Sequence, residues 1–193
     1  MRVLGALVWL LAAVGLGASL GGAWFLARGI SAKPQPSPLE AAMAHRLRAL
    51  AIPSAAARRE NPVPASADVI AKGLAHFADH CASCHANNGS GTTALGQGLY
   101  PRAPDLRLPG TQQLSDGTLF YIIENGVKLT GMPAWGAGTS EGEAASWHLV
   151  RFIRHLPALS EAELQHMEAL NPRSAEEWRE LEEERKFLEG ESR

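Results

Sequence analysis

Two cysteines followed by a histidine, spaced Cys-x-x-Cys-His, are the feature that most constrains this chain. Cys81 and Cys84 are the only cysteines among its 193 residues, and His85 directly follows the second one. A pair with this spacing serves as a dithiol redox motif, as half of a zinc site or as the covalent attachment point of haem. The surrounding sequence must decide among these three uses.

The dithiol and zinc uses fit the surrounding sequence poorly. A thioredoxin-type motif begins a helix that follows a strand, whereas here a helical pattern from Ser66 runs straight into Cys81 with no strand before it. A structural zinc site needs four ligands, and the chain has neither a second cysteine pair nor two downstream histidines at zinc-finger spacing. A thiol-disulfide oxidoreductase stays open as the weaker alternative.

Haem attachment explains the spacing physically. Two thiols three residues apart lie on one side of a helical turn, so both can form thioethers with the two vinyl groups of one porphyrin, and His85 is then placed to bind the iron. Met132, in the loop sequence TGMPAWG, is the predicted second axial ligand, because its soft thioether suits haem iron. The other methionines lie in the terminus, the stem and the acidic tail: Met1, Met43 and Met167.

The N-terminal segment is strongly apolar. Residues 3–27 carry no charge and are bracketed by Arg2 and Arg28. About 20 apolar residues suffice for a helix to cross a bilayer, whereas signal peptides have apolar regions of only about 7–15 residues. We therefore expect residues 1–28 to form a transmembrane anchor, with a cleaved signal as the alternative.

Residues 29–65 form a Pro/Ser-rich stem with one short helical pattern. Leu39, Met43, Leu47 and Leu50 recur at helical spacing before Pro53 ends the pattern. This amphipathic segment is expected to be a linker helix, and it could instead lie on the membrane or dock on a partner.

Residues 66–157 carry three helical patterns, at 66–80, 115–126 and 143–157, and no alternating strand pattern. The fold class is therefore expected to be all-α. A Gly/Asn/Pro-rich stretch of nearly thirty residues separates the first two helices, so a domain this small buries little on its own. A haem would fill its centre.

Charge is unevenly distributed. The net charge of −2 argues against a nucleic-acid partner, because phosphate binding needs a basic face. Residues 1–65 are net basic, with seven Lys/Arg and two Glu, and residues 158–193 are net acidic, with eleven Glu and five Lys/Arg. The acidic tail, 158–193, is expected to form short helices beginning at Ser160 and Ser174 with a solvated face, although it could also be a docking surface.

Residues 66–157 resemble the class I monohaem c-type cytochromes, and among them the membrane-anchored bacterial members. Gly73 and Phe77 resemble the glycine–aromatic pair of that family's first helix, where the glycine lets the last helix cross closely. Leu149 and Phe152 resemble the partners on the last helix.

The resemblance also implies roles around the haem. The carbonyl of Pro104 would accept a hydrogen bond from the His85 ring, Leu106 would pack on the haem, and Trp135 would lie near the haem edge or a propionate. With Cys81, Cys84, His85 and Met132, these residues complete the predicted site for one covalent haem c.

The implied function is one-electron transfer without catalytic residues, because filled axial positions leave no site for substrate. The chain would be a carrier, or a subunit of a respiratory or dehydrogenase complex, with redox proteins as partners. The resemblance places the haem domain on the periplasmic side of the cytoplasmic membrane, on a single-pass anchor. The alternative is a haem enzyme or gas sensor in which Met132 is displaced.

Overall fold

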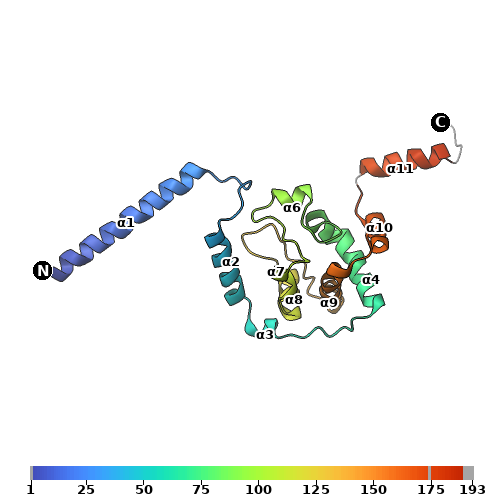
Figure 1. Ribbon diagram of the computed structural model, residues 1–193, viewed down its shortest axis with the longest axis horizontal. Helices are drawn as coiled ribbons and strands as arrows, with labels where there is room; N and C mark the ends of the chain where they lie inside the picture. The colour runs from blue at the N-terminus through green and yellow to red at the C-terminus, as the bar shows by residue number, and fades with distance from the viewer. Residues whose placement is uncertain (1, 174, 189–193) are drawn as a thin grey trace. The chain divides into compact units, whose positions relative to one another are not determined.

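A computed structural model describes residues 2–173 and 175–188 (Figure 1). This part of the chain contains helices and no strands, which confirms the expected all-α class. The chain divides into two compact units, residues 1–35 and residues 36–193. The helices are α1 (Arg2–Arg28), α2 (Pro38–Ala51), α3 (Ser54–Ala57), α4 (Ala67–His76), η1 (Phe77–Cys81), α5 (Ala82–His85), α6 (Ala94–Gly98), α7 (Pro109–Gln112), α8 (Asp116–Asn125), α9 (Ser140–His155), η2 (Leu156–Ala158), α10 (Glu161–Leu170) and α11 (Ala175–Leu188).

The first unit consists mainly of α1. Its segment Leu4–Ala27 has a mean hydropathy of 2.0, and no part of its apolar window is buried. The segment is long and apolar enough to cross a bilayer, and a signal sequence would have the same properties. The predicted apolar helix is therefore present.

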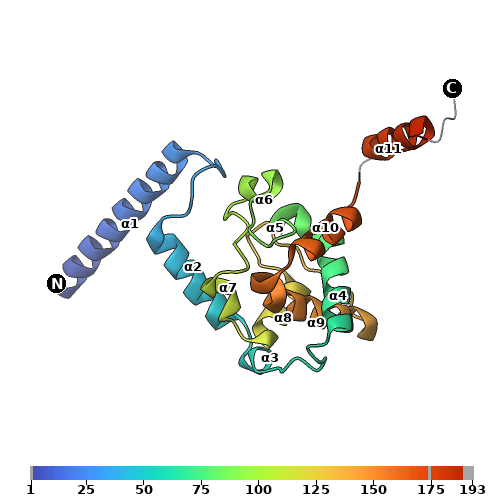
Figure 2. The same ribbon diagram turned by 45° about the vertical axis from the view of Figure 1, so that its right-hand side comes forward.

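Helices α4 and α9 share the most extensive helix–helix contact in the described part of the chain, and they lie side by side in Figures 1 and 2. A Cβ added at Gly73 of α4 would lie only 2.3 Å from the carbonyl oxygen of His148 and 2.8 Å from Cβ of Phe152. The rings of Phe77 and Phe152 pack beside this point with centroids 5.1 Å apart, and both side chains are fully buried. The close crossing predicted from Gly73 is therefore present.

Helix α8 completes the core against α9. Its apolar face, with Leu119, Phe120 and Ile123, is buried. Phe120 stacks on Trp147 of α9 with ring centroids 4.1 Å apart. Ser115 begins α8, as the sequence predicts, and its hydroxyl accepts a hydrogen bond from the backbone of Thr118.

The second half of the predicted stem lies along the haem domain. The hydroxyl of Ser115 donates a 2.6 Å hydrogen bond to the carbonyl of Ala57, and the side-chain amide of Asn61 donates one to the carbonyl of Trp147. A Cβ at Gly117 would lie 2.2 Å from the carbonyl oxygen of Ala56, so only glycine permits this approach. We call residues 52–65 the strap.

The acidic tail begins with a docked helix. Met167 of α10 is fully buried in the domain core, so this part of the tail is more than a solvated face. Ser160 caps α10 as predicted, and its capping box with Glu163 is complete. The other predicted start, Ser174, lies outside the described residues.

We expect Gly73→Ala to destabilise the domain, because the new methyl group would force α4 away from the backbone of His148. Overpacking of this kind costs about 1–3 kcal/mol. Denaturant unfolding of the haem-loaded chain, followed by its helical circular dichroism, measures the change. Gly110→Ala is the matched control, because a Cβ there meets nothing within 4 Å. Equal losses of stability in the two variants would contradict the crossing's role.

We also expect the stabilising contribution of Glu163 to be lost as the pH is lowered. The backbone N–H and hydroxyl of Ser160, together with His155, hold the pKa of the Glu163 carboxyl below its ordinary value of 4.5. A carboxyl with a lowered folded-state pKa stabilises the fold above its unfolded pKa and loses that contribution as pH falls through the folded pKa.

Glu163→Gln should therefore lower stability at neutral pH by about 0.5–1 kcal/mol, the scale of a helix cap, and the difference from the parent should vanish in acid. Thermal melts across the acidic range measure it, with exposed Glu161→Gln as control. A difference that persists at low pH would show that the carboxylate charge is not the cause.

Candidate haem site

The Cys-x-x-Cys-His motif lies where helix α4 gives way to a π-helical turn. Helix α4 passes into the π-helical turn η1, which ends at Cys81, and α5 then ends at His85. Cys81 and Cys84 are free thiols and both are half-buried. Single π-turns inside helices often mark functional sites, because the extra residue re-aims the side chains that follow.

The imidazole of His85 has one buried nitrogen. Its Nδ1 has no partner within ordinary hydrogen-bond geometry. Burial lowers the pKa of His85, and the carbonyl of Pro104 opposes that shift by interacting with the ring. The hydrogen bond from the His85 ring to the Pro104 carbonyl therefore stays a prediction. The lowered pKa favours the neutral imidazole, which is the form that binds metal.

The segment after the motif folds back against it. The hydroxyl of Thr93 donates to the carbonyl of Cys84 at 3.1 Å. A Cβ at Gly96 would lie 2.1 Å from that same oxygen, so glycine is required for the approach. The backbone N–H of Leu106 donates to the carbonyl of Gly89, and the Leu106 side chain is buried in the core.

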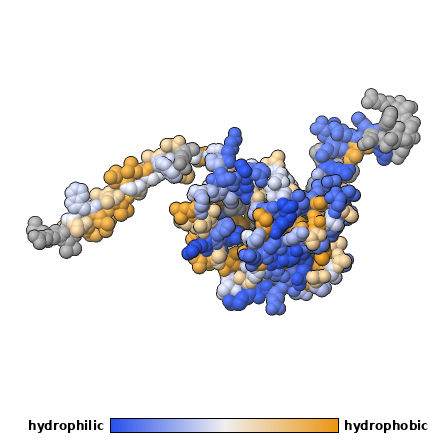
Figure 3. Space-filling model, viewed as in Figure 1, coloured by the Kyte–Doolittle hydropathy of each residue, from blue (hydrophilic) through white to orange (hydrophobic). Residues whose placement is uncertain are grey.

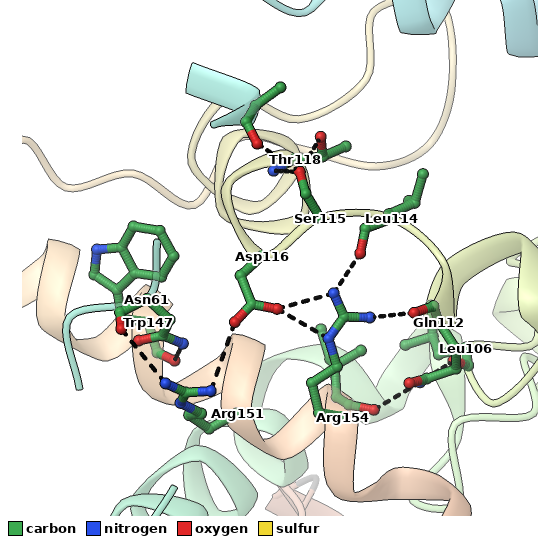
Figure 4. Close-up of polar contacts among 12 residues, drawn as sticks. Asn61, Leu106, Gln112, Leu114, Ser115, Asp116, Thr118, Trp147, Arg151 and Arg154 are labelled. Carbon is green, nitrogen blue, oxygen red and sulfur yellow. Dashed lines mark hydrogen bonds and ion pairs between the residues drawn. The ribbon is translucent and has the colours of Figure 1, made fainter. Parts of the chain in front are cut away.

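Gln112 ties this segment to α9 (Figure 4). Its side-chain amide nitrogen donates to the carbonyl of Leu106 at 2.7 Å and to the carbonyl of Ile153 at 2.8 Å. The guanidinium of Arg154 in turn donates to the carbonyl of Gln112 and to Asp116. A lone glutamine has no sequence signature, so sequence reasoning missed this residue.

The Met132 loop joins α8 to α9. Met132 is half-buried. Its backbone N–H donates to the hydroxyl of Thr130, and its carbonyl accepts from the N–H of Val127. Gly126 ends α8 with a φ of +66°, and a Cβ there would lie 2.7 Å from the carbonyl oxygen of Met132. The loop is therefore held close to the end of α8.

Trp135 connects the Met132 loop to the cysteine motif. Its backbone N–H donates to the carbonyl of Ile123, and its ring meets that of His80 edge-on with centroids 5.3 Å apart. His80 directly precedes Cys81, and both Trp135 and Cys81 pack against the core cluster. The structure thus brings together the two segments that carry the predicted ligands. Pro104 is exposed at the edge of the site.

The thiols are poorly suited to dithiol chemistry. Burial, with a smaller contribution from Cys84, raises the pKa of Cys81 to about 12. The attacking thiol of a redox motif needs a lowered pKa, because the thiolate is the nucleophile. Among the described residues, no three His, Cys, Asp or Glu side chains gather as a metal site. Neither alternative use of the cysteines is therefore supported.

The residues present fit a covalently bound haem. Two free thiols occupy one short helical stretch, and a histidine with a lowered pKa follows them. A methionine loop is connected to the same stretch through Trp135 and His80. Haem supplies four iron ligands of its own, so a histidine and a methionine are all that the chain must add.

We expect Gln112→Leu to loosen the segment that carries Pro104 and Leu106. The substitution removes the shared donor of two carbonyl groups, which costs about 1–3 kcal/mol when they stay buried. Denaturant unfolding of the haem-loaded chain measures the loss. Gln113→Leu is the control, because its side chain is exposed. Unchanged stability in Gln112→Leu would contradict the bridging role.

One family model matches this chain, that of cytochrome c oxidase, cbb3-type, subunit III, over residues 68–153. No curated protein matches the chain. The matched range contains the cysteine motif, the Met132 loop and the crossing of α4 with α9, and it leaves out α1, α2 and the tail. Residues 68–153 therefore form a c-type cytochrome domain, whose cofactor is covalently bound haem c.

Proposed function

We propose that this chain is a membrane-anchored c-type cytochrome that transfers single electrons through a His/Met-ligated haem. Cys81 and Cys84 would hold the haem by thioether bonds, with His85 and Met132 as its axial ligands. The contact between Trp135 and His80 carries the proposal, because it joins the methionine loop to the cysteine motif.

The bound haem supplies a centre that accepts and releases one electron. His85 would bind the iron as a neutral imidazole, which its lowered pKa favours, and the Pro104 carbonyl would orient its ring. Met132 would supply the second ligand from the chain, and its thioether would favour a positive potential. Buried side chains around the motif, Phe77 and Leu106 among them, would keep water away from the haem.

The apolar helix α1 supports an anchor in the cytoplasmic membrane, and we propose that the haem domain lies on its periplasmic side. The matching family is named for a subunit of an oxidase. We therefore propose that the chain serves as a subunit of a respiratory complex, or as a carrier that exchanges electrons with one. Its partners would be redox proteins at the same membrane.

We expect the haem to remain with the polypeptide after denaturation in acidified organic solvent. We expect Met132→Ala to retain haem but to lose the weak red absorption of the iron–thioether bond. Its potential should fall by about 0.1 V or more, since axial ligands set haem potentials over a range of about 0.8 V. Visible spectroscopy and redox titration of the purified chain measure both changes.

Met43→Ala is the control, because Met43 is exposed on α2 and lies outside the matched range. An unchanged spectrum and potential in Met132→Ala would refute His/Met ligation. Rapid binding of carbon monoxide by the reduced parent chain would instead favour the gas-sensing or enzymatic alternative, in which Met132 is readily displaced.

A further inference from the structure

Helix α2 carries an apolar face that nothing in the described structure covers. Leu39, Met43, Leu47 and Leu50 are 71%, 55%, 62% and 83% exposed. At 3.6 residues per turn, these four side chains fall within an arc of roughly 80° on the helix. Figure 3 shows hydrophobic residues on the flank of the domain where α2 lies. The face is therefore continuous, and it points away from the core.

The opposite side of α2 is held by the cytochrome domain. Ala41 and Arg48 are half-buried, and Ile52, just beyond the helix, is buried. These three positions lie opposite the apolar arc on the helical wheel. At the edge of the apolar arc, beside Leu47, the hydroxyl of Tyr100 donates a 2.5 Å hydrogen bond to Glu40. Helix α2 is thus packed on the domain by one side, and its apolar side remains outward.

The occupant of this face can be argued from chain length. Only nine residues, 29–37, separate α1 from α2, and nine extended residues span about 30 Å at most. If α1 crosses a bilayer, α2 cannot move far from the surface of that bilayer. Hydrophobic side chains kept this close to lipid have a nearby apolar phase in which to be buried.

The charge of the segment around α2 also favours the bilayer as the occupant of this face. Residues 28–47 contain three basic residues, Arg28, Lys33 and Arg46, and one acidic residue, Glu40, which suits anionic lipid headgroups. Arg46 lies about 20° from Leu39 on the helical wheel, at the edge of the apolar arc, where a long side chain can reach the headgroups while its stem covers apolar surface. Amphipathic helices with basic residues bury their apolar face at this depth of a bilayer.

We propose that α2 lies in the surface of the bilayer that α1 crosses, with its apolar face in the acyl-chain boundary and Arg46 among anionic headgroups. This inference rests on the membrane anchorage proposed above. The strap bonds the chain after α2 to α8 and α9, so α2 holds the haem domain in one orientation against the membrane. Residues 38–65 of the stem are then held against the haem domain, and only residues 29–37 form a free linker between α1 and α2.

Thiol labelling in lipid nanodiscs tests this orientation. Met43→Cys and His45→Cys are a matched pair, because they lie on opposite sides of α2 and both parent side chains are exposed. The full haem-loaded chain is placed in discs containing phosphatidylcholine and phosphatidylglycerol and treated with a water-soluble maleimide. Each rate is normalised to that of the same variant unfolded in guanidinium.

We expect the cysteine at position 45 to react at least tenfold faster than the cysteine at position 43. We also expect Leu47→Glu with Leu50→Glu, introduced into the Met43→Cys chain, to restore fast labelling at position 43 without changing the haem spectrum. Equal rates at positions 43 and 45 would overturn the proposal. Protection at position 43 that survives the two glutamates would overturn it too, since that result indicates a protein neighbour.

Failure of the proposed function gives different results. The parent chain should not react with maleimide, because thioether-bound Cys81 and Cys84 present no free thiol. Labelling of the parent would therefore contradict haem attachment through these cysteines. Loss of the chain from the discs would contradict the anchor. With both controls passed, equal rates at positions 43 and 45 count against the placement of α2 alone.

Discussion

The close crossing of α4 and α9 at Gly73 fixes where the cysteine motif and the residues predicted to bind haem lie. Helix α4 continues through η1 into α5 without a break. Its packing against α9 therefore also positions Cys81 and His85. The buried rings of Phe77 and Phe152 pack against each other and prevent one helix from rotating against the other at this crossing. A side chain larger than glycine at position 73 would therefore shift the whole cysteine motif relative to the rest of the domain.

Two loops reach the motif from the other side, and both are held by α8 and α9. Gln112 and Arg154 tie the Leu106 segment to α9 through backbone carbonyls. The hydroxyl of Ser146 on α9 donates a 2.5 Å hydrogen bond to Glu124, whose backbone carbonyl binds the N–H of Gly136 beyond Trp135. Long loops around a cofactor are thus ordered by polar contacts to rigid helices, because their own apolar content is small.

The strap gives the domain a second attachment to its stem. Arg59 lies over the Phe120 ring at 4.5 Å and pairs with Glu143 at 3.3 Å. Asn61 and Val63 are bonded to α9 through Trp147 and Arg151. Together with Gly117, these contacts make residues 52–65 part of the domain's surface.

The sequence by itself determined the local chemistry: the cysteine motif, the apolar helix α1 and the Ser115 and Ser160 helix caps follow from short-range patterns. The resemblance to c-type cytochromes implied the glycine at the helix crossing. Only the tertiary structure decided which distant groups meet. The docking of the strap, the burial of Met167, the Gln112 bridge and the contact of Trp135 with His80 depend on how helices pack. Such contacts join residues far apart in the chain, and no spacing between neighbours encodes them.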